Sequence, residues 1–209
     1  MATYTGDFHE YWLHKGHIYG QCYLEPNAKL VYVNIPKNAS SWTKQHIPNW
    51  QCVNYFKQST TDWKYIVVLR DPIERWISGI VQYFFEYNID PDFNNTAFCN
   101  LIFDRIAFDD HTERQILFIQ DIPIEKTTFI KCDKSYSTNF IDLMRSNGID
   151  IKNEIIQVNT ITQNAKKIEL KELILARLKL NTSYEESLRK YYERDYELFN
   201  WVQFFNSAT

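Results

Sequence analysis

The stretch Leu30-Val31-Tyr32-Val33-Asn34-Ile35-Pro36-Lys37-Asn38-Ala39-Ser40-Ser41-Trp42 decides the fold expected for this chain. Its first residues form a continuous apolar run, which is typical of a strand buried on both faces. A short loop with one lysine and two serines follows, and a helix is expected after it. Such a junction favours anion binding, because backbone N–H groups at the start of a helix have no intrahelical acceptor. Lys37 would add a full positive charge.

The loop differs from the common nucleotide-binding loop G-x-x-x-x-G-K-[ST]. No glycine lies between Gly20 and Gly79, and Lys37 precedes the serines without standing immediately before one. The pattern therefore disfavours a kinase or a GTPase.

A second strand-to-helix junction lies further along the chain. The apolar run Tyr65-Ile66-Val67-Val68-Leu69 is followed by Arg70-Asp71-Pro72-Ile73-Glu74-Arg75-Trp76-Ile77-Ser78-Gly79. Asp71 is a favourable N-cap, Pro72 fits the first helical position, and Glu74 stands three residues after the cap. We therefore expect Arg70 at the end of a buried strand and Ser78 two turns into a helix.

Together the two stretches resemble the phosphate-binding segments of sulfotransferases that use 3′-phosphoadenosine 5′-phosphosulfate (PAPS). In that family a P-K-x-x-[ST]-[ST]-x loop grips the 5′-phosphosulfate, and an R-D-P-x-x-R-x-x-S-G stretch after a later strand grips the 3′-phosphate. The resemblance implies a P-loop-NTPase-like sulfotransferase fold, with PAPS as cofactor and 3′,5′-bisphosphoadenosine (PAP) as product. The loop lacks the glycine common in cytosolic sulfotransferases of small molecules, so it is more similar to the carbohydrate-modifying branch.

The resemblance also implies roles for single residues. The 5′-phosphosulfate loop would consist of Lys37, Asn38, Ala39, Ser40, Ser41 and Trp42, and the 3′-phosphate contacts would be Arg70 and Ser78. Lys37 would also be catalytic, because its charge is suited to stabilise the leaving 5′-phosphate oxygen. Further resemblance lies in Asp110-His111 with Gln115 downstream, in 129–133 and in 191–199.

An acceptor hydroxyl also needs a base, and a neutral histidine suits this role near neutral pH. His111 follows Asp109 and Asp110 at an expected loop-to-helix boundary, and it resembles the family's histidine upstream of a glutamine. We therefore expect His111 to be the catalytic base. The alternatives are Glu113, Glu86 and His46. No metal is expected, because no acidic cluster accompanies the loop.

The composition is that of a packed globular protein. The 209 residues are 44% hydrophobic and 16% aromatic, with few glycines and prolines, so a single domain over 1–209 is expected. A formal net charge of −3 argues against a general nucleic-acid partner. The irregular cysteine spacing fits neither zinc ligation nor a disulfide framework. No apolar stretch reaches the length needed to cross a bilayer.

The loop also bears on localisation. Asn38-Ala39-Ser40 is formally a glycosylation sequon, and a glycan there would block the expected phosphate site. This favours a cytoplasmic protein, with the soluble catalytic domain of a Golgi-type membrane enzyme as the alternative.

Alternating strand-like and helix-like segments predict an α/β fold with a mainly parallel central sheet flanked by helices. Strands are expected at 30–35, 65–70, 127–132 and 154–158, with a weaker candidate at 52–56. Helices are expected at 40–47, 72–86, 97–107, 112–119, 137–146, 166–179 and 184–204. Because ligands of open α/β sheets bind beyond the carboxyl ends of the strands, Lys37 and Arg70 should leave the same end of neighbouring parallel strands.

Two charged side chains are expected to be structural. Asp195 interrupts an apolar stripe, so its carboxylate requires a hydrogen-bonded or charged partner. Arg75 is expected to pair with a carboxylate such as that of Asp71.

Two other functions remain open. A nucleotide- or sulfate-binding module would use the same loop without transfer, and a diverged P-loop nucleotide kinase would need a metal-binding carboxylate and a glycine loop. Carbohydrate is the favoured acceptor, while a tyrosyl peptide, a lipid or a small alcohol are alternatives.

Overall fold

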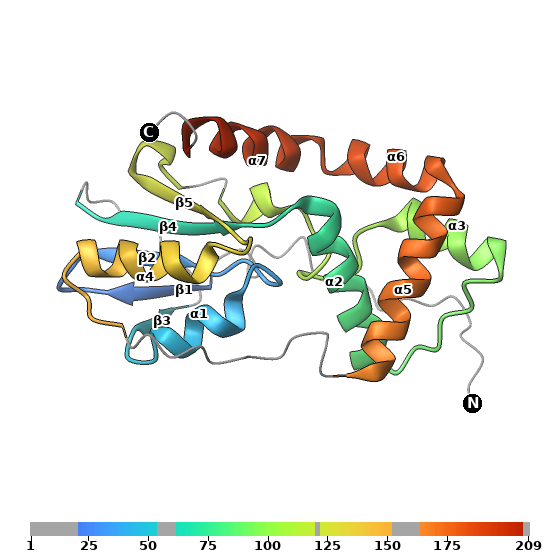
Figure 1. Cartoon of the computed structure of the whole chain (residues 1–209), viewed down its shortest axis with the longest axis horizontal. Helices are drawn as coiled ribbons and strands as arrows, with labels where there is room; N and C mark the ends of the chain where they lie inside the picture. Colours follow the sequence, from blue (N-terminus) through green and yellow to red (C-terminus); the bar gives the residue numbers. More distant parts are fainter. Residues whose placement is uncertain (1–20, 54–61, 120–121, 152–163, 207–209) are drawn as a thin grey trace.

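The two apolar runs form the centre of a sheet. β2 (Leu30–Val33) and β4 (Lys64–Leu69) pair in parallel, and nearly all their residues are buried. They lie in the middle of a five-stranded sheet of order β3-β1-β2-β4-β5 (Figure 1). This computed structural model describes residues 21–53, 62–119, 122–151 and 164–206, with side chains as far as Val202.

The other elements complete a single-domain α/β fold. The remaining strands are β1 (Cys22–Glu25), β3 (Gln51–Val53) and β5 (Thr127–Lys131). The helices are α1 (Ser40–His46), α2 (Pro72–Glu86), α3 (Thr96–Arg105), α4 (Tyr136–Ser146), α5 (Ala165–Leu180), α6 (Thr182–Tyr191) and α7 (Glu193–Asn206). Short 3₁₀ helices span Gln115–Phe118 and Ile124–Lys126.

The sheet is mixed, and the expectation of a mainly parallel sheet is wrong. The pairs β2–β4 and β4–β5 are parallel, whereas β1 pairs antiparallel with both β2 and β3. The difference comes from β1, a strand that the sequence analysis missed. It forms a hairpin with β2, and in the turn between them the Glu25 carboxylate accepts a hydrogen bond from the Ala28 N–H. Lys29 completes the turn in a left-handed conformation, with φ 52°.

Several other expectations can be compared with the observed elements. Helix 72–86 is confirmed with the same bounds as α2. The expected helix 112–119 is wrong, since only a 3₁₀ helix forms there, and the expected helix 184–204 is two helices that meet at Tyr192. The strand expected at 154–158 lies outside the described residues.

Three apolar clusters hold the elements together. One joins a face of the sheet to α1 and α4, another joins the opposite face to α7 and the Gln115–Phe118 segment, and the third lies among α2, α3, α5 and α6 beside the sheet (Figure 1). Central members of these clusters are Tyr32, Ile66 and Phe140 in the first, Val31, Val67 and Phe118 in the second, and Trp76, Phe103 and Leu188 in the third.

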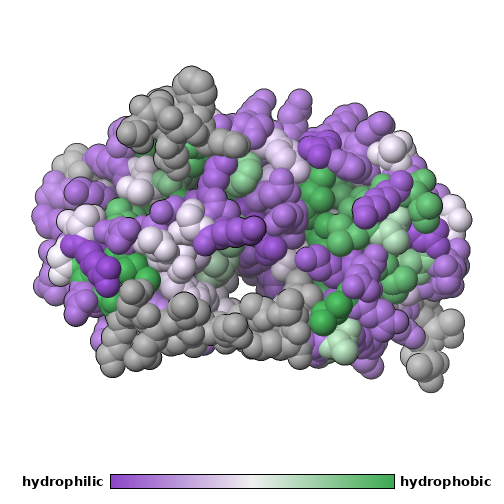
Figure 2. Space-filling model, viewed as in Figure 1, coloured by the Kyte–Doolittle hydropathy of each residue, from purple (hydrophilic) through white to green (hydrophobic). Residues whose placement is uncertain are grey.

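The loops after β2 and β4 therefore lie between the sheet and the helical cluster. Both strands end toward α2 (Figure 1). The expectation that Lys37 and Arg70 follow the same end of neighbouring parallel strands is confirmed. In the same view, Figure 2 shows mostly hydrophilic residues where the sheet meets the helical cluster.

Membrane insertion is not indicated by any described helix. Each one is too short or too polar to span a bilayer.

Candidate functional site

The loop after β2 turns sharply without a glycine. Lys37 and Ala39 both have left-handed backbones, with φ 68° and 55°, and Ala39 leads directly into α1. Because α1 has only seven residues, its dipole is short. An anion at this loop would therefore depend chiefly on the Lys37 ammonium and on the hydroxyls of Ser40 and Ser41.

Arg70 connects this loop to the start of α2. Its Nη1 donates a hydrogen bond to the Lys37 carbonyl oxygen at 3.2 Å, and its Nε lies 3.6 Å from the Glu74 carboxylate. The helix start behind it is well capped, because Asp71 Oδ1 accepts from the Glu74 N–H at 2.9 Å. The structure thus brings the lysine loop and the arginine segment into direct contact.

Lys37 lies among charged groups of both signs. Its pKa falls to about 8, chiefly because burial disfavours the charged ammonium and secondly because of the positive charge of Lys167 on α5. Arg70 acts in the same direction, whereas Glu86 and Asp109 partly oppose the shift. An anionic ligand placed here would stabilise the charged form of Lys37.

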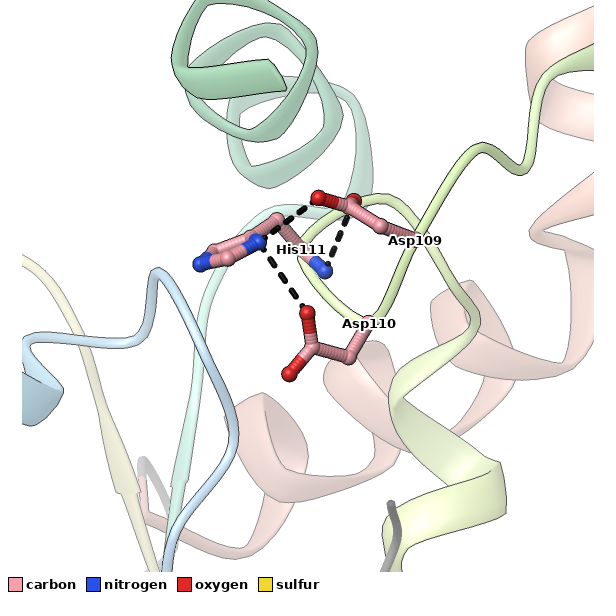
Figure 3. Close-up of side chains that lie close together, drawn as sticks. All are labelled: Asp109, Asp110 and His111. Carbon is pink, nitrogen blue, oxygen red and sulfur yellow. Dashed lines mark hydrogen bonds and ion pairs between the residues drawn. The ribbon is translucent and has the colours of Figure 1, made fainter. Parts of the chain in front are cut away.

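His111 is paired with two carboxylates (Figure 3). Its Nδ1 lies 2.8 Å from Asp109 Oδ2 and 3.0 Å from Asp110 Oδ1, and its main-chain N–H also donates to Asp109 Oδ1. Nε2 points away from both carboxylates (Figure 3). Burial alone would lower the pKa of His111, but the hydrogen bonds and charges of the two aspartates outweigh it and raise this pKa to about 9.

This protonation state differs from the neutral histidine expected from the sequence. At pH 7 the His111 ring is an imidazolium, so it must lose a proton before it can accept one. Because the two aspartates account for the shift, the residues immediately before His111 set its basicity.

Among the residues that the structure describes, Asp109, Asp110 and His111 form a group whose side-chain atoms lie close enough to one another to hold a metal ion. One potential ligand atom from each of Asp109, Asp110 and His111 lies within 4.8 Å of the others. The hydrogen bonds and ion pairs within the cluster account for this geometry.

Arg75 is a buried structural cation, but not in the expected way. Its guanidinium is fully buried and does not pair with Asp71. Instead Nε donates to the Pro36 carbonyl at 2.9 Å, Nη2 donates to the Asp110 carbonyl at 2.8 Å, and Nη1 donates to the Glu113 carbonyl. Arg75 therefore ties α2 to the lysine loop and to the His111 segment.

Gln115 and Asn38 form a further link that the sequence analysis did not foresee. Asn38 belongs to the expected phosphate loop, yet its side chain is fully buried and donates to Gln115 Oε1 at 2.6 Å. A glycan on this asparagine would thus require the loop to open. The sequence points to Gln115 only through the family resemblance, and no local pattern indicates that its side chain reaches the loop.

The other expected site residues lie in different surroundings. Ser78 is 6% exposed on α2, whereas Ser40 is half-buried and Ser41 is exposed. Trp42 stacks on His46 with ring centroids 3.7 Å apart and packs against Tyr136 of α4. Its ring thus belongs to the apolar cluster under the sheet, and the same stacking contact involves His46, one of the alternative bases.

The two alternative glutamates are also engaged. Glu113 is buried, and its Oε1 accepts from the Tyr191 hydroxyl at 2.7 Å and from the Arg114 N–H at 2.9 Å. Glu86 is exposed at the end of α2, where it accepts from Gln82 Nε2 at 2.5 Å. Glu86 also acts electrostatically on Lys37.

Comparisons of this chain with family models, curated proteins and solved structures find no match.

Proposed function

We propose that the chain transfers a sulfuryl group from PAPS to an acceptor hydroxyl, with a carbohydrate as the favoured acceptor. The observation that carries the proposal is the hydrogen bond from Arg70 Nη1 to the Lys37 carbonyl, which joins the two phosphate motifs at the ends of adjacent parallel strands. Burial and the charge of Lys167 lower the pKa of Lys37, and a polyanionic ligand beside it would favour its charged form.

The residues present fit PAPS, which would supply the sulfuryl group and leave as PAP. Lys37, with the hydroxyls of Ser40 and Ser41, would hold the 5′-phosphosulfate and stabilise charge on the leaving oxygen. Arg70 and Ser78 would hold the 3′-phosphate. Remote binding of this kind orients the donor for in-line attack.

His111 would remove the acceptor proton through Nε2. Asp109 and Asp110 hold the ring by Nδ1, which leaves Nε2 directed away from them (Figure 3). Because the ring is protonated at neutral pH, turnover through this route should rise as the pH approaches about 9.

Ligand binding tests the dedicated 3′-phosphate contact. Arg70→Ala should weaken PAP binding by roughly 1.5–3 kcal/mol, the scale of a charge-assisted hydrogen bond, and should weaken AMP binding much less, through loss of the bond to the Lys37 carbonyl alone. Arg145→Ala on α4 is the matched control, because Arg145 is half-exposed and pairs only loosely with Asp142. Calorimetry with both nucleotides provides the measurement. Equal affinity of the wild type for PAP and AMP would exclude the 3′-phosphate site.

A binding module without transfer is the second candidate, and the protonated state of His111 favours it. The two functions differ in the response to His111→Ala. In the enzyme, this substitution should lower sulfate transfer from labelled PAPS by roughly a hundredfold while leaving PAP affinity nearly intact. Absence of transfer by the wild type over a panel of carbohydrate, peptide and lipid acceptors would favour the binding module. Normal transfer by His111→Ala would move the search for a base to Glu86, Glu113 or His46.

A further inference from the structure

The side chain of Gln115 lies between the two phosphate motifs and bonds to both. It is 1% exposed. Its Oε1 accepts from Asn38 Nδ2 at 2.6 Å and from the Arg70 N–H at 3.0 Å, and its Nε2 donates to the Arg70 carbonyl at 2.9 Å. One carboxamide therefore holds the loop after β2 and the loop after β4 in a fixed relation.

The partners determine the orientation of both amides. Asn38 Nδ2 also donates to the Val68 carbonyl at 2.7 Å, so rotating this amide would set its oxygen against two acceptors. Rotating Gln115 would set its NH₂ group against the Arg70 N–H and its oxygen against the Arg70 carbonyl. Each side chain thus has one arrangement that satisfies these neighbours.

The backbone of Gln115 is fixed from the opposite side by α7. Asp195, which is 1% exposed, accepts from the Gln115 N–H at 2.7 Å and from the Ile116 N–H at 2.9 Å. These bonds supply the partners that a buried carboxylate requires, as expected from the sequence. The C-terminal helix thereby anchors the glutamine that spans the two loops.

A nucleotide with phosphates at the 5′ and 3′ positions needs two cationic contacts at a fixed distance from each other. Loops are more mobile than the strands they follow. If each loop became ordered only when the ligand binds, the entropy lost in ordering it would lower the affinity for the ligand. A buried side chain that bonds to both loops lowers this cost by fixing them before the ligand arrives.

We propose that Gln115 is a positioning residue that sets the distance between the Lys37 loop and Arg70, with Asp195 as its anchor. The ligand class that this arrangement serves is a nucleoside phosphorylated at both the 5′ and 3′ positions. The inference rests on the proposed function, and it identifies Gln115 as the residue through which the two phosphate contacts cooperate.

Gln115→Met tests the inference because it keeps the side-chain length and removes the hydrogen bonds. We expect PAP affinity to fall roughly tenfold to hundredfold, whereas AMP affinity should change less than threefold. If Gln115 acts by placing Arg70, the double variant Arg70→Ala/Gln115→Met should bind PAP no more than about twofold more weakly than Arg70→Ala alone. Gln45→Met, on the exposed side of α1, is the matched control.

Asp195→Asn tests the same inference through the anchor of Gln115. It keeps one acceptor oxygen and places an NH₂ group against a backbone N–H, so it should give the same selective loss of PAP affinity with a smaller magnitude. It also replaces Gln115→Met if that variant fails to show a cooperative thermal transition.

The possible results separate the two proposals. Equal losses for PAP and AMP, or additive losses in the double variant, would overturn the positioning role and leave Gln115 as an ordinary structural residue. A wild type that does not prefer PAP to AMP would overturn the proposed function itself, and this is seen before any variant is made.

Discussion

At the scale of single residues, the lowered pKa of Lys37 predicts a pH limit on the proposed binding of PAP. Burial and the charge of Lys167 bring this pKa to about 8, so the ammonium is present below this pH and is lost above it. PAP affinity should therefore hold from pH 6.5 to about 8 and then fall roughly tenfold or more toward pH 10, the scale of a charge-assisted contact. Calorimetry at a series of pH values measures the fall.

Lys37→Arg is the control for this titration. A guanidinium stays charged over the whole range, and the phosphates of PAP do not titrate above about pH 7. The variant should bind PAP with an affinity that no longer falls above pH 8. A similar fall in both proteins would assign the titration to another group.

His111 predicts a pH dependence of stability. Its pKa in the folded protein, about 9, lies above the ordinary 6.5, so the folded state binds the proton more tightly. The stabilisation is complete below pH 6.5 and is lost as the pH rises through about 9, with a total on the order of 3 kcal/mol. Urea unfolding at pH 6, 7, 8 and 9 measures it.

His111→Gln removes the titrating ring and should flatten this decline. Above pH 8 the lowered pKa of Lys37 acts in the opposite sense, because the unfolded chain then binds more protons at that lysine. Both proteins share Lys37, so the difference between their stability curves isolates His111. A constant difference from pH 6 to 9 would show that the aspartates do not hold the proton on the ring.

At the scale of elements, α2 and the His111 segment pack backbone against backbone at Gly79. A Cβ added there would overlap the His111 carbonyl oxygen, so the two segments would have to separate. Gly79→Ala should therefore lower the free energy of unfolding by about 1–3 kcal/mol, the usual cost of overpacking, and should lower turnover by displacing His111. Urea unfolding and sulfate transfer measure the two effects.

Gly148→Ala is the matched glycine control. Gly148 has φ 76° and open space around it, so alanine there costs about 1 kcal/mol of backbone strain without any contact. This variant should lose stability but keep normal turnover per folded molecule. Undiminished turnover in Gly79→Ala would show that the close approach does not place His111.

The elements that could be predicted are those with local signals. The cap at Asp71 and the proline at position 72 fixed the start of α2, and its bounds agree with the expectation. The expected helix 112–119 does not form, because side-chain carboxylates accept hydrogen bonds from several of its backbone N–H groups. Asp195 accepts from Gln115 and Ile116, and Glu113 accepts from its neighbour Arg114. No local pattern could indicate the Asp195 contact, since the partners are 79 and 80 residues apart.

At the scale of the whole molecule, the candidate site combines residues from the sheet, from α2 and from α7. Lys37 and Arg70 follow central strands, Arg75 lies on α2, and Asp195 anchors Gln115 from α7. The sequence could indicate the first two because each stands at a strand-to-helix junction. The joining residues depend on contacts between segments distant in sequence, so they emerge only from the folded arrangement.

Because the site joins the sheet to the helical cluster, a ligand bound there should stabilise the whole fold against heat. At a concentration of 100 times its Kd, a ligand adds about 2.7 kcal/mol, and for a chain of 150–250 residues each kcal/mol raises Tm by about 2–4 °C. PAP should therefore raise the Tm by roughly 5–10 °C, and AMP at the same concentration should raise it much less. Arg70→Ala should remove most of the difference between the two nucleotides. ATP with magnesium is the third ligand in this thermal-shift series: a larger rise with ATP and magnesium than with PAP would contradict the PAPS proposal and favour a diverged nucleotide kinase.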